Sequence, residues 1–365
     1  MTDAPLSLLF AWPTSGQRNS LGESTGSLIG NLARHGDSSP CLIAYDGSSR
    51  PDIAPLRSHR HLLISSRRER EAFLKTLNPE IDADAERWAL IGEKPGRGAG
   101  TNRNAILLSG AGDIVVSTDD DILCAPAVLP GFKESPVSER TVSREQNPAP
   151  CRYFPDRTTC VESVVPTDID LAARYRSFFG PEPDAAGIIL ASPGSYGDSG
   201  FGSARGSLSL DNEQRAQLHG DGYERLRLSR EITRIPLTDT VARGTGLMTM
   251  QAAFDARLPL PPFFPVGRAE DSLFGLMLRI IYPESRTLFP AFGFLHDPPA
   301  PRTFDRRSLT GFGPCLAELV MALAVVCVPA SGVTEPEQRF MAVAENLREI
   351  ASLRMSDFVA VLHES

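Results

Sequence analysis

The chain has 365 residues, of which 41% are hydrophobic and 22% charged, so it is long enough to bury a sizeable core as a globular protein. Its formal net charge of −8 argues against a nucleic-acid-binding protein, because such proteins need a basic face for phosphates. The six cysteines are scattered and lack the tight pairs of a zinc site. This pattern indicates a protein of the reducing cytoplasm, and it favours free thiols over a disulfide between Cys151 and Cys160.

The first predicted elements have the pattern of a nucleotide-binding half. Leu6–Trp12 is a buried strand that we expect Pro13 to stop, and a helix follows near Ser27–Arg34. Cys41–Tyr45 is a second strand and leads directly into Asp46. A strand, a helix and a second strand that ends in an acid form a βαβ unit that can bind a nucleotide. Asp46 and the glycine after it equally suit a tight turn, so both interpretations stay open.

The following stretch is predicted to contain two more strands around a charged helix. His61–Ser65 is the third strand, Arg67–Leu77 a helix, and Trp88–Ile91 a short fourth strand. The early arginines of the helix alternate with glutamates, which favours a solvated, salt-bridged face over a phosphate contact. The glycine-rich loop Gly92–Gly100 offers backbone N–H groups that could face phosphates.

The centre of the chain is a short helix followed by a buried strand. Thr101 can cap the helix, and Gly110 and Gly112 can end it. Asp113–Thr118 is β-branched and apolar, as in a sheet that is covered on both faces.

Three acids follow that strand: Asp119, Asp120 and Asp121. Three carboxylates at the carboxyl end of a buried strand repel one another unless a cation sits among them. Open α/β sheets bind their ligands at this edge, so a hard divalent metal that holds a polyphosphate is the simplest explanation. A solvated acidic turn is the alternative.

This central pattern resembles that of the family 2-like nucleotide-sugar glycosyltransferases of the GT-A fold. The matching segments are Arg103–Ala105, Gly112-Asp113, Ile114–Thr118 and Asp119–Asp121. The resemblance implies an α/β fold with a Rossmann-like, mostly parallel central sheet and flanking helices. It also implies a nucleoside-diphosphate sugar as donor and Mn²⁺ or Mg²⁺ as cofactor.

The same resemblance assigns roles to individual residues. Asp46 would contact the nucleoside, and Arg103, Asp119 and Asp120 would bind the donor. Asp119 and Asp121 would hold the metal on the diphosphate.

The middle of the chain is predicted to be irregular. Leu129–Thr159 is polar and proline-rich, as in a loop or flap between two halves. A helix over Thr167–Phe179, capped by Thr167 or Asp168, and a strand over Gly187–Ala191 follow. Ser192–Ser207 is dense in glycine and serine, which predicts a mobile loop that is either a linker or a lid. The polar residues of this loop are Tyr196, Asp198 and Arg205.

A second acidic motif follows a predicted strand at Thr245–Met250. Glu270 and Asp271 open an apolar helix that continues to Ile281. An acceptor hydroxyl is a poor nucleophile until a base takes its proton, and the resemblance implies that Asp271 is this base, with Glu270 beside it. Acids in a first helical turn also stabilise the helix dipole, which would explain them without chemistry. A strand at Ala291–Leu295 then leads to His296, an additional metal ligand or a satisfied imidazole.

The C-terminal part is predicted to be helical. Pro314–Cys327 is a buried helix, because its apolar run Leu319–Val328 is shorter than the roughly 20 residues that cross a bilayer. Thr334–Glu337 is a capping box for a second helix. These helices would pack on the catalytic domain or form a homo-oligomer, and the helical pattern leaves open that the natural chain continues beyond Ser365. The amino terminus lacks a basic region, so we expect no signal peptide.

Together these patterns predict three regions: a donor half at 1–128, an acceptor half at 129–310 and a helical extension at 311–365. The expected function is the metal-dependent transfer of a sugar from a nucleoside-diphosphate donor to a hydroxyl of a glycan, peptide or small molecule, with inversion at the sugar. The alternatives are a nucleotidyltransferase of related fold and a non-catalytic sugar-nucleotide-binding scaffold. Tyr45 before Asp46 and Ala269 before Glu270 depart from the family pattern, which leaves the nucleotide and the stereochemistry open.

Overall fold

The computed structural model describes residues 5–16, 20–47, 51, 59, 61–77, 83–93, 99–132, 141–143, 151–198, 212, 229–243, 249–265, 269–299, 316–326 and 333–364. The helices in these ranges are α1 (Ser20–Arg34), α2 (Arg67–Leu74), α3 (Ala83–Ile91), α4 (Ala99–Ser109), α5 (Arg157–Glu162), α6 (Leu171–Arg176), α9 (Glu270–Ile281), α11 (Leu316–Val326), α12 (Pro336–Ser352) and α13 (Met355–Glu364). The strands are β1 (Leu8–Thr14), β2 (Cys41–Tyr45), β3 (Leu62–Ser66), β4 (Ile114–Thr118), β5 (Ile122–Val128), β6 (Thr141–Ser143), β7 (Cys151–Tyr153), β8 (Val165–Pro166), β9 (Ile188–Ala191), β10 (Gly194–Asp198), β11 (Glu231–Arg234), β12 (Thr240–Ala242), β13 (Gln251–Asp255), β14 (Arg286–Phe289) and β15 (Gly293–His296).

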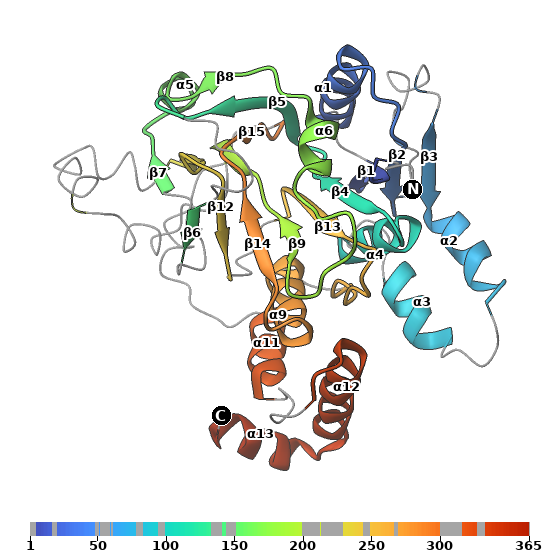
Figure 1. Ribbon diagram of the computed structural model, residues 1–365. Helices are drawn as coiled ribbons and strands as arrows, with labels where there is room; N and C mark the ends of the chain where they lie inside the picture. The colour runs from blue at the N-terminus through green and yellow to red at the C-terminus, as the bar shows by residue number, and fades with distance from the viewer. Residues whose placement is uncertain are drawn as a thin grey trace.

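A large mixed sheet runs through the middle of the molecule (Figure 1). In the described residues its order is β3-β2-β1-β4-β13-β9-β14-β12-β6. The strands β1 to β4 are parallel, β13 is antiparallel to both of its neighbours, and β9 and β14 are again parallel to each other. The prediction of an α/β fold with a mostly parallel central sheet is therefore confirmed.

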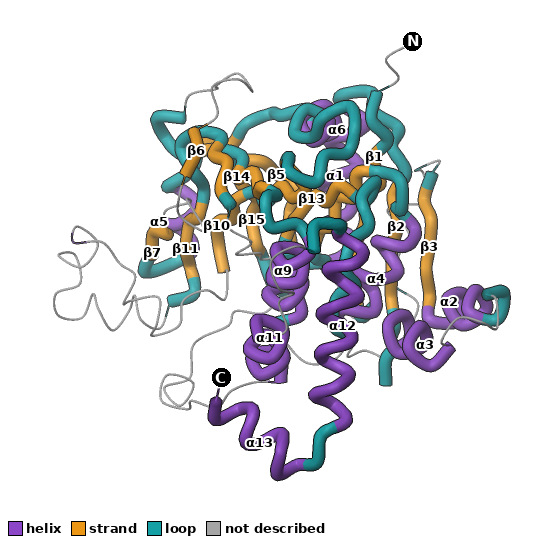
Figure 2. Tube along the Cα trace, turned by 60° about the horizontal axis from the view of Figure 1, so that its bottom comes forward, coloured by secondary structure: helices purple, strands orange, loops and turns teal. Residues whose placement is uncertain are grey.

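Helices cover both faces of this sheet, because successive side chains of a strand point to opposite faces. In β1, Leu8, Phe10 and Trp12 join a core that also contains residues of α1 and α6. Leu9 and Ala11 face the other way, into a core with α4 and α9. Figure 2 shows α1 and α6 on one side of the sheets and α4, α9, α11 and α12 on the other.

A second sheet, in the order β7-β11-β10-β15-β5-β8, packs beside the first. The segment Ser192–Ser207 was predicted to be a mobile loop, and for Gly194–Asp198 this is wrong. These residues are the buried strand β10, which pairs with β11 and β15. Glycines there serve close packing: a side chain on Gly194 would overlap the backbone of β11, and one on Gly293 would overlap Gly194. Residues 199–207, including Arg205, lie outside the described residues.

Two other strand predictions are wrong in type or position. Trp88–Ile91 forms the last turns of α3, because the segment before it contains alanines and first-turn acids that favour a helix. Of the strand predicted at Thr245–Met250, residues 245–248 lie outside the described part, Thr249 and Met250 form a turn, and the described strand that follows is Gln251–Asp255. The alanines of this strand have weak strand propensity, and burial between β4 and β9 decides its structure.

Proline does not stop the first strand, contrary to the prediction. Pro13 pairs with β2, while the last residue of β1 that pairs with β4 is Ala11. The ladder to β4 has ended before Pro13, so its missing N–H is tolerated there.

Two predicted helix caps are also replaced by their neighbours. Asp170 caps α6 by accepting from the backbone N–H of Ala173 at 3.0 Å. The predicted Thr334–Glu337 capping box does not form, because α12 begins at Pro336 with Glu335 as an N-cap that makes no side-chain cap hydrogen bond. Proline suits the first helical position, where the missing N–H has no intrahelical acceptor.

The C-terminal helices pack on α9, as one of the two predicted arrangements. Ile280, Ala324 and Val343 form a small buried cluster from α9, α11 and α12. Arg339 of α12 donates from Nε to the carbonyl oxygen of Ile280 at 2.6 Å. Among the described helices, none has the length and apolar character needed to span a membrane. Described cysteines 41, 124, 151 and 160 form no disulfide, as predicted for Cys151 and Cys160.

Close packing between α4 and the segment before α9 gives a testable prediction. A Cβ at Gly100 would overlap the carbonyl oxygen of Phe264, whereas a Cβ at Gly26 of α1 meets no atom within 4 Å. We expect Gly100→Ala to lower the free energy of unfolding by about 2 kcal/mol. The control Gly26→Ala should raise it by about 0.5 kcal/mol, because alanine has the better helix propensity. Urea denaturation of both variants measures this, and a neutral Gly100→Ala would contradict the packing.

Candidate functional site

The candidate site lies at the carboxyl edge of the large sheet, where the chain order reverses. Strand β1 has β2 on one side and β4 on the other, so the connections leave it in opposite directions. Such a switch point is where open α/β sheets bind ligands. Thr14 ends β1, Asp46 follows β2 and Asp119 follows β4, so the predicted acids meet at this edge.

Arg103 of α4 connects the two acidic motifs. Its side chain is 5% exposed, and it donates from Nη2 to Asp119 at 2.5 Å and from Nη1 to Glu270 at 3.1 Å. Its guanidinium also lies 5.8 Å from the centre of the Phe263 ring. Burial lowers the pKa of Arg103, but the surrounding carboxylates, led by Asp119 and Glu270, outweigh this and raise it. Asp271 contributes to the same field, so residues far apart in sequence converge here.

Each acid of the triplet has a partner within the protein. Asp119 pairs with Arg103 as above, Asp120 accepts from the hydroxyl of Thr14 at 2.6 Å, and Asp121 lies 3.2 Å from Nε2 of His296. Asp120 and Asp121 are buried, whereas the side chain of Asp119 is 28% exposed. Asp119 is therefore the acid of the three that a ligand can reach most directly.

The charge on Asp119 is only partly compensated. Burial, together with the charges of Asp121, Asp120 and Glu270, raises its pKa to about 8, although Arg103 opposes the shift. Burial and the neighbouring carboxylates thus outweigh the single guanidinium in their effect on Asp119. This imbalance suits the binding of a further cation or of a ligand that brings one.

The donor set fits Mg²⁺ or Mn²⁺ only in part. Carboxylate oxygens are the ligands that these ions prefer, and Mg²⁺ is commonly held by one or two carboxylates plus substrate phosphates. Among the described residues, no three His, Cys, Asp or Glu side chains are grouped to hold a metal. The predicted set of Asp119, Asp121 and His296 is therefore not a preformed cage, and Asp119 is the carboxylate that would hold an ion bound mainly by phosphates.

Two residues to which the sequence analysis gave no role in the site shape the nucleoside side of this edge. Asn102 donates from Nδ2 to the carbonyl oxygen of Thr14 at 2.9 Å and to Asp46 at 3.2 Å. Arg70, expected on a solvated face, is buried and donates to the carbonyl oxygens of Tyr45 at 2.8 Å and Thr101 at 3.1 Å. The Arg103-Asn104 motif directly after Asn102 could have pointed to Asn102 as a site residue. The alternating charges of α2 contain no sign that Arg70 is buried.

Asp46 lies at this edge but is buried, with 2% of its surface exposed. Its carboxylate accepts from Asn102, so it supports the floor of the edge through that amide. Direct contact with a nucleoside would require one of these two side chains to move.

The first turn of α9 brings the predicted base to the same place. Glu270 is 15% exposed and paired with Arg103, and Asp271 is half-buried and accepts from the backbone N–H of Ser272 at 2.8 Å. Ala269, just before them, has a left-handed conformation with φ of 67°. An L side chain rarely adopts this conformation, and strained backbone of this kind is concentrated at functional sites.

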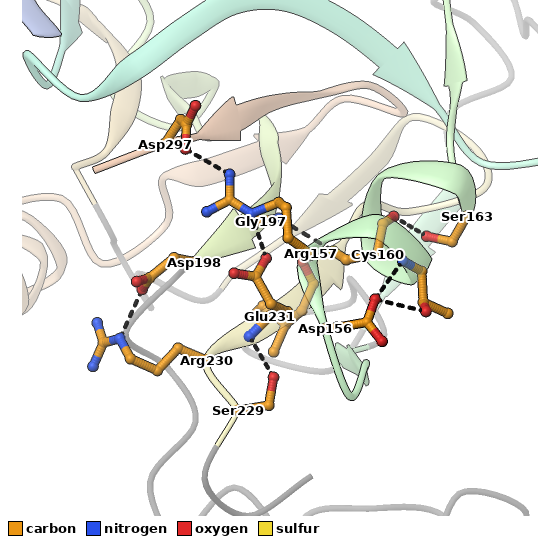
Figure 3. Close-up of polar contacts among 12 residues, drawn as sticks. Asp156, Arg157, Cys160, Ser163, Gly197, Asp198, Ser229, Arg230, Glu231 and Asp297 are labelled. Carbon is orange, nitrogen blue, oxygen red and sulfur yellow. Dashed lines mark hydrogen bonds and ion pairs between the residues drawn. The ribbon is translucent and has the colours of Figure 1, made fainter. Parts of the chain in front are cut away.

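A polar network on the second sheet extends to the triplet, and Figure 3 shows the part of it around Arg157. Arg157 at the start of α5 donates to Glu231 at 2.8 Å and to Asp297 at 2.7 Å. Asp297 follows His296, and its backbone N–H donates to the carbonyl oxygen of Asp121 at 2.8 Å. Asp297 thus connects Arg157 of α5 with the backbone of Asp121, and it holds the neighbouring His296 beside the Asp121 carboxylate.

The residues predicted to be polar groups of a lid have structural partners instead. Asp198 is buried and accepts from Arg230 at 2.7 Å (Figure 3). The hydroxyl of Tyr196 donates to the carbonyl oxygen of Ala125 at 3.3 Å.

Comparisons with known proteins do not identify a function for this chain. No protein-family model matches the chain, and no curated protein sequence matches it. Among solved structures, it is similar to one described as "Crystal Structure of a Mycobacterial Protein", with 14% sequence identity and a TM-score of 0.37. That match covers 90% of this chain and 77% of the other. Similarity at this level identifies neither a fold family nor a function.

The raised pKa of Asp119 predicts a pH-dependent stability. The folded chain holds this proton up to about pH 8, whereas the unfolded chain releases it near the ordinary value of 3.8, so folding binds a proton in between. Stability should therefore fall as the pH rises through this window. Denaturation midpoints at about pH 5 and pH 8.5 measure it, and Asp119→Asn, which cannot titrate, should lose less over the same interval. Equal losses in both proteins would contradict the assignment.

Removing Arg103 should destabilise the fold. Arg103→Met leaves Asp119 and Glu270 without their shared cation, and we expect a loss of about 3 kcal/mol in the free energy of unfolding. Adding Glu270→Gln to this variant should restore about 1 kcal/mol, because one carboxylate is removed. The control Arg243→Met removes an ion pair to Glu284 in which both side chains are more than 60% exposed, and should cost less than about 0.5 kcal/mol. Similar losses in Arg103→Met and Arg243→Met would contradict the central role of Arg103.

Proposed function

We propose that the chain is a nucleotide-sugar glycosyltransferase of the GT-A fold, which moves a sugar from a nucleoside-diphosphate donor to an acceptor hydroxyl. The observation that carries the proposal is the position of Arg103 between Asp119 and Glu270. The two motifs that resemble this family are far apart in sequence and meet at one guanidinium. Their meeting supports a single site that handles both donor and acceptor.

The sheet supports the donor side of the proposal. The acids after β2 and β4 lie at the switch point on either side of β1, where a nucleotide is expected in an open α/β sheet. Helix α4 begins at the same edge and carries Asn102 and Arg103 in its first turns. Its N-terminal N–H groups and the arginine suit a diphosphate.

The start of α9 supports the acceptor side. Glu270 is occupied by Arg103, so Asp271 is the better candidate to accept the proton of an acceptor hydroxyl. In this role Asp271 would act as the general base of an inverting transfer, with the leaving group on the opposite side of the sugar. The strained Ala269 fixes the backbone at the point where this carboxylate leaves the helix.

A divalent cation, Mn²⁺ or Mg²⁺, would supply charge neutralisation for the departing nucleoside diphosphate. Asp119 would hold this cation, and the buried pair of Asp121 and His296 would lie next to Asp119 without being its main ligands. Arg103 would hold Asp119 on the donor side and Glu270 on the acceptor side at a fixed distance from each other. We further propose that the chain associates with a second copy through α12 and α13, because Met341, Leu353 and Met355 are exposed in this region.

The function is tested by incubation with a panel of nucleoside-diphosphate sugars and Mn²⁺, with the released nucleoside diphosphate as readout. We expect turnover of at least one donor. Binding without turnover would favour a scaffold protein, and pyrophosphate release from a nucleoside triphosphate would favour a nucleotidyltransferase.

Variants separate the two halves of the proposed site. Asp119→Ala should abolish cation-dependent donor binding, whereas Asp271→Asn should preserve donor binding and lower transfer by about 10²–10⁴-fold. Calorimetric titration with donor and a transfer assay measure the two effects. The exposed Glu284→Gln is the control and should change neither. If Asp119→Ala and Asp271→Asn both retain full activity, the site assignment is wrong.

A further inference from the structure

A small cavity lies at the seam between the two sheets, beside the acidic edge. It has a volume of about 30 Å³, and its polar lining comes from Gln251 of β13, Arg234 of β11, Ser195 of β10 and Ser192. Apolar side chains, among them Phe294 of β15, complete the lining. On this measure a single water needs about 10–15 Å³, so the cavity has room for a planar group of two or three heavy atoms and not for a whole sugar. We refer to it as the seam pocket.

Gln251 is the most unusual residue of the seam pocket. Its side chain is 3% exposed, and within the described part of the chain neither the nitrogen nor the oxygen of its amide has a hydrogen-bond partner. A buried amide that lacks both partners is costly and is rare in native structures. Gln251 lines the pocket, so an acceptor bound there can pair with the N–H of its amide.

Among the described residues that line the seam pocket, Arg234 is the charged one. Burial lowers the pKa of Arg234 to about 10, and the groups that act in the opposite direction are Cys151 and Tyr153 rather than carboxylates. The guanidinium stays charged at neutral pH. None of the described lining residues is acidic. The pocket therefore has the opposite charge preference from the triplet that lies next to it.

Two residues that line the seam pocket are direct neighbours of the aspartate triplet. Ile122 lines the pocket and directly follows Asp121. Met250 lines it as well, and its carbonyl oxygen accepts from the backbone N–H of Asp119 at 2.8 Å. Residues that line the pocket are therefore direct neighbours of the first and last aspartates of the triplet.

We propose that the seam pocket binds a carboxylate of the ligand that occupies this edge, with Arg234 and Gln251 as its donors. Guanidinium groups recognise carboxylates through two parallel N–H bonds, and the Gln251 amide adds another N–H. Phe289 and Phe294 exclude water and so strengthen these bonds. The volume suits a carboxylate better than the larger phosphate.

This inference deepens the proposed function and rests on it only for the identity of the ligand. The carboxylate could belong to a uronic acid moiety of the donor or to a hydroxy acid that serves as acceptor. The recognition chemistry is the same in both cases. Binding of an isolated carboxylate needs no nucleotide, so it can be tested apart from sugar transfer.

The first experiment compares glucuronate with glucose, two probes that differ in the carboxylate, by ligand-observed NMR titration of the full chain. We expect glucuronate to bind in the millimolar range, as is usual for so small a ligand, and glucose to bind at least about tenfold more weakly. Equal binding of the two sugars, or no binding of glucuronate up to about 100 mM, overturns the proposal. Inorganic phosphate that binds more tightly than glucuronate overturns it as well.

Two variants locate the binding. Arg234→Gln and Gln251→Met should each weaken glucuronate binding by about tenfold. The control Arg243→Gln makes the same charge change at an arginine that is 66% exposed and should leave binding unchanged. Unchanged binding in Arg234→Gln and Gln251→Met, or equal weakening in Arg243→Gln, contradicts the seam pocket as the site.

Thermal stability distinguishes a binding role of Gln251 from a structural role. Methionine has a similar shape without the unpartnered amide, so Gln251→Met should raise the Tm by about 2 °C while glucuronate binding weakens about tenfold. A glutamine that holds the fold together would give a lower Tm on substitution. A lower Tm with retained glucuronate binding overturns the proposal.

A final comparison assigns the carboxylate to donor or acceptor. If the donor carries it, a nucleoside-diphosphate uronic acid should lose affinity in Arg234→Gln while its neutral-sugar counterpart does not. If the acceptor carries it, both donors should bind Arg234→Gln as they bind the unaltered chain, and lactate should compete with glucuronate. Carboxylate binding without any transfer would remove the proposed function and keep this inference. Transfer that uses a carboxylate-bearing donor or acceptor and keeps its original rate in Arg234→Gln would remove this inference and keep the proposed function.

Discussion

The interaction on which the site depends is the pairing of one buried guanidinium with two carboxylates from different parts of the chain. Arg103 holds Asp119 at the end of β4 and Glu270 at the start of α9. Because desolvation makes an uncompensated charge expensive, each of these groups requires the others to be in place. The arrangement therefore couples the folding of the first half of the sheet to the docking of α9. It also fixes the distance between the two acidic motifs that define the proposed site.

Much of the site could be predicted from the sequence because its signals are local. An apolar β-branched run followed by Asp119–Asp121 indicates both a buried strand and its functional end, and Glu270 is followed by residues at helical spacing. The contacts between these segments have no such signal. The pairing of Arg103 with Glu270, the clamp of Asn102 on Asp46 and the burial of Arg70 depend on which strands are neighbours in the sheet.

The errors have a common physical origin in tertiary context. Trp88–Ile91 is apolar enough for a strand, but the residues before it favour a helix. The four residues alone fit either structure, and the full segment Ala83–Ile91 is long enough to indicate a helix. Gly194–Asp198 is dense in small residues, which suggested a mobile loop, yet those glycines permit the backbone of β10 to lie against β15. Gln251–Asp255 is a strand because its neighbours pair with it, and not because its residues prefer strands.

The backbone of the aspartate triplet joins the two sheets. At one end, the N–H of Asp119 donates to Met250 beside the large sheet, and at the other end the carbonyl oxygen of Asp121 accepts from Asp297, next to β15 of the second sheet. A rotation of one sheet against the other would pass through this three-residue hinge. Motions of the second sheet, including any that follow contact with a partner far from the edge, would thereby change the spacing of the acidic side chains and the geometry available to a ligand.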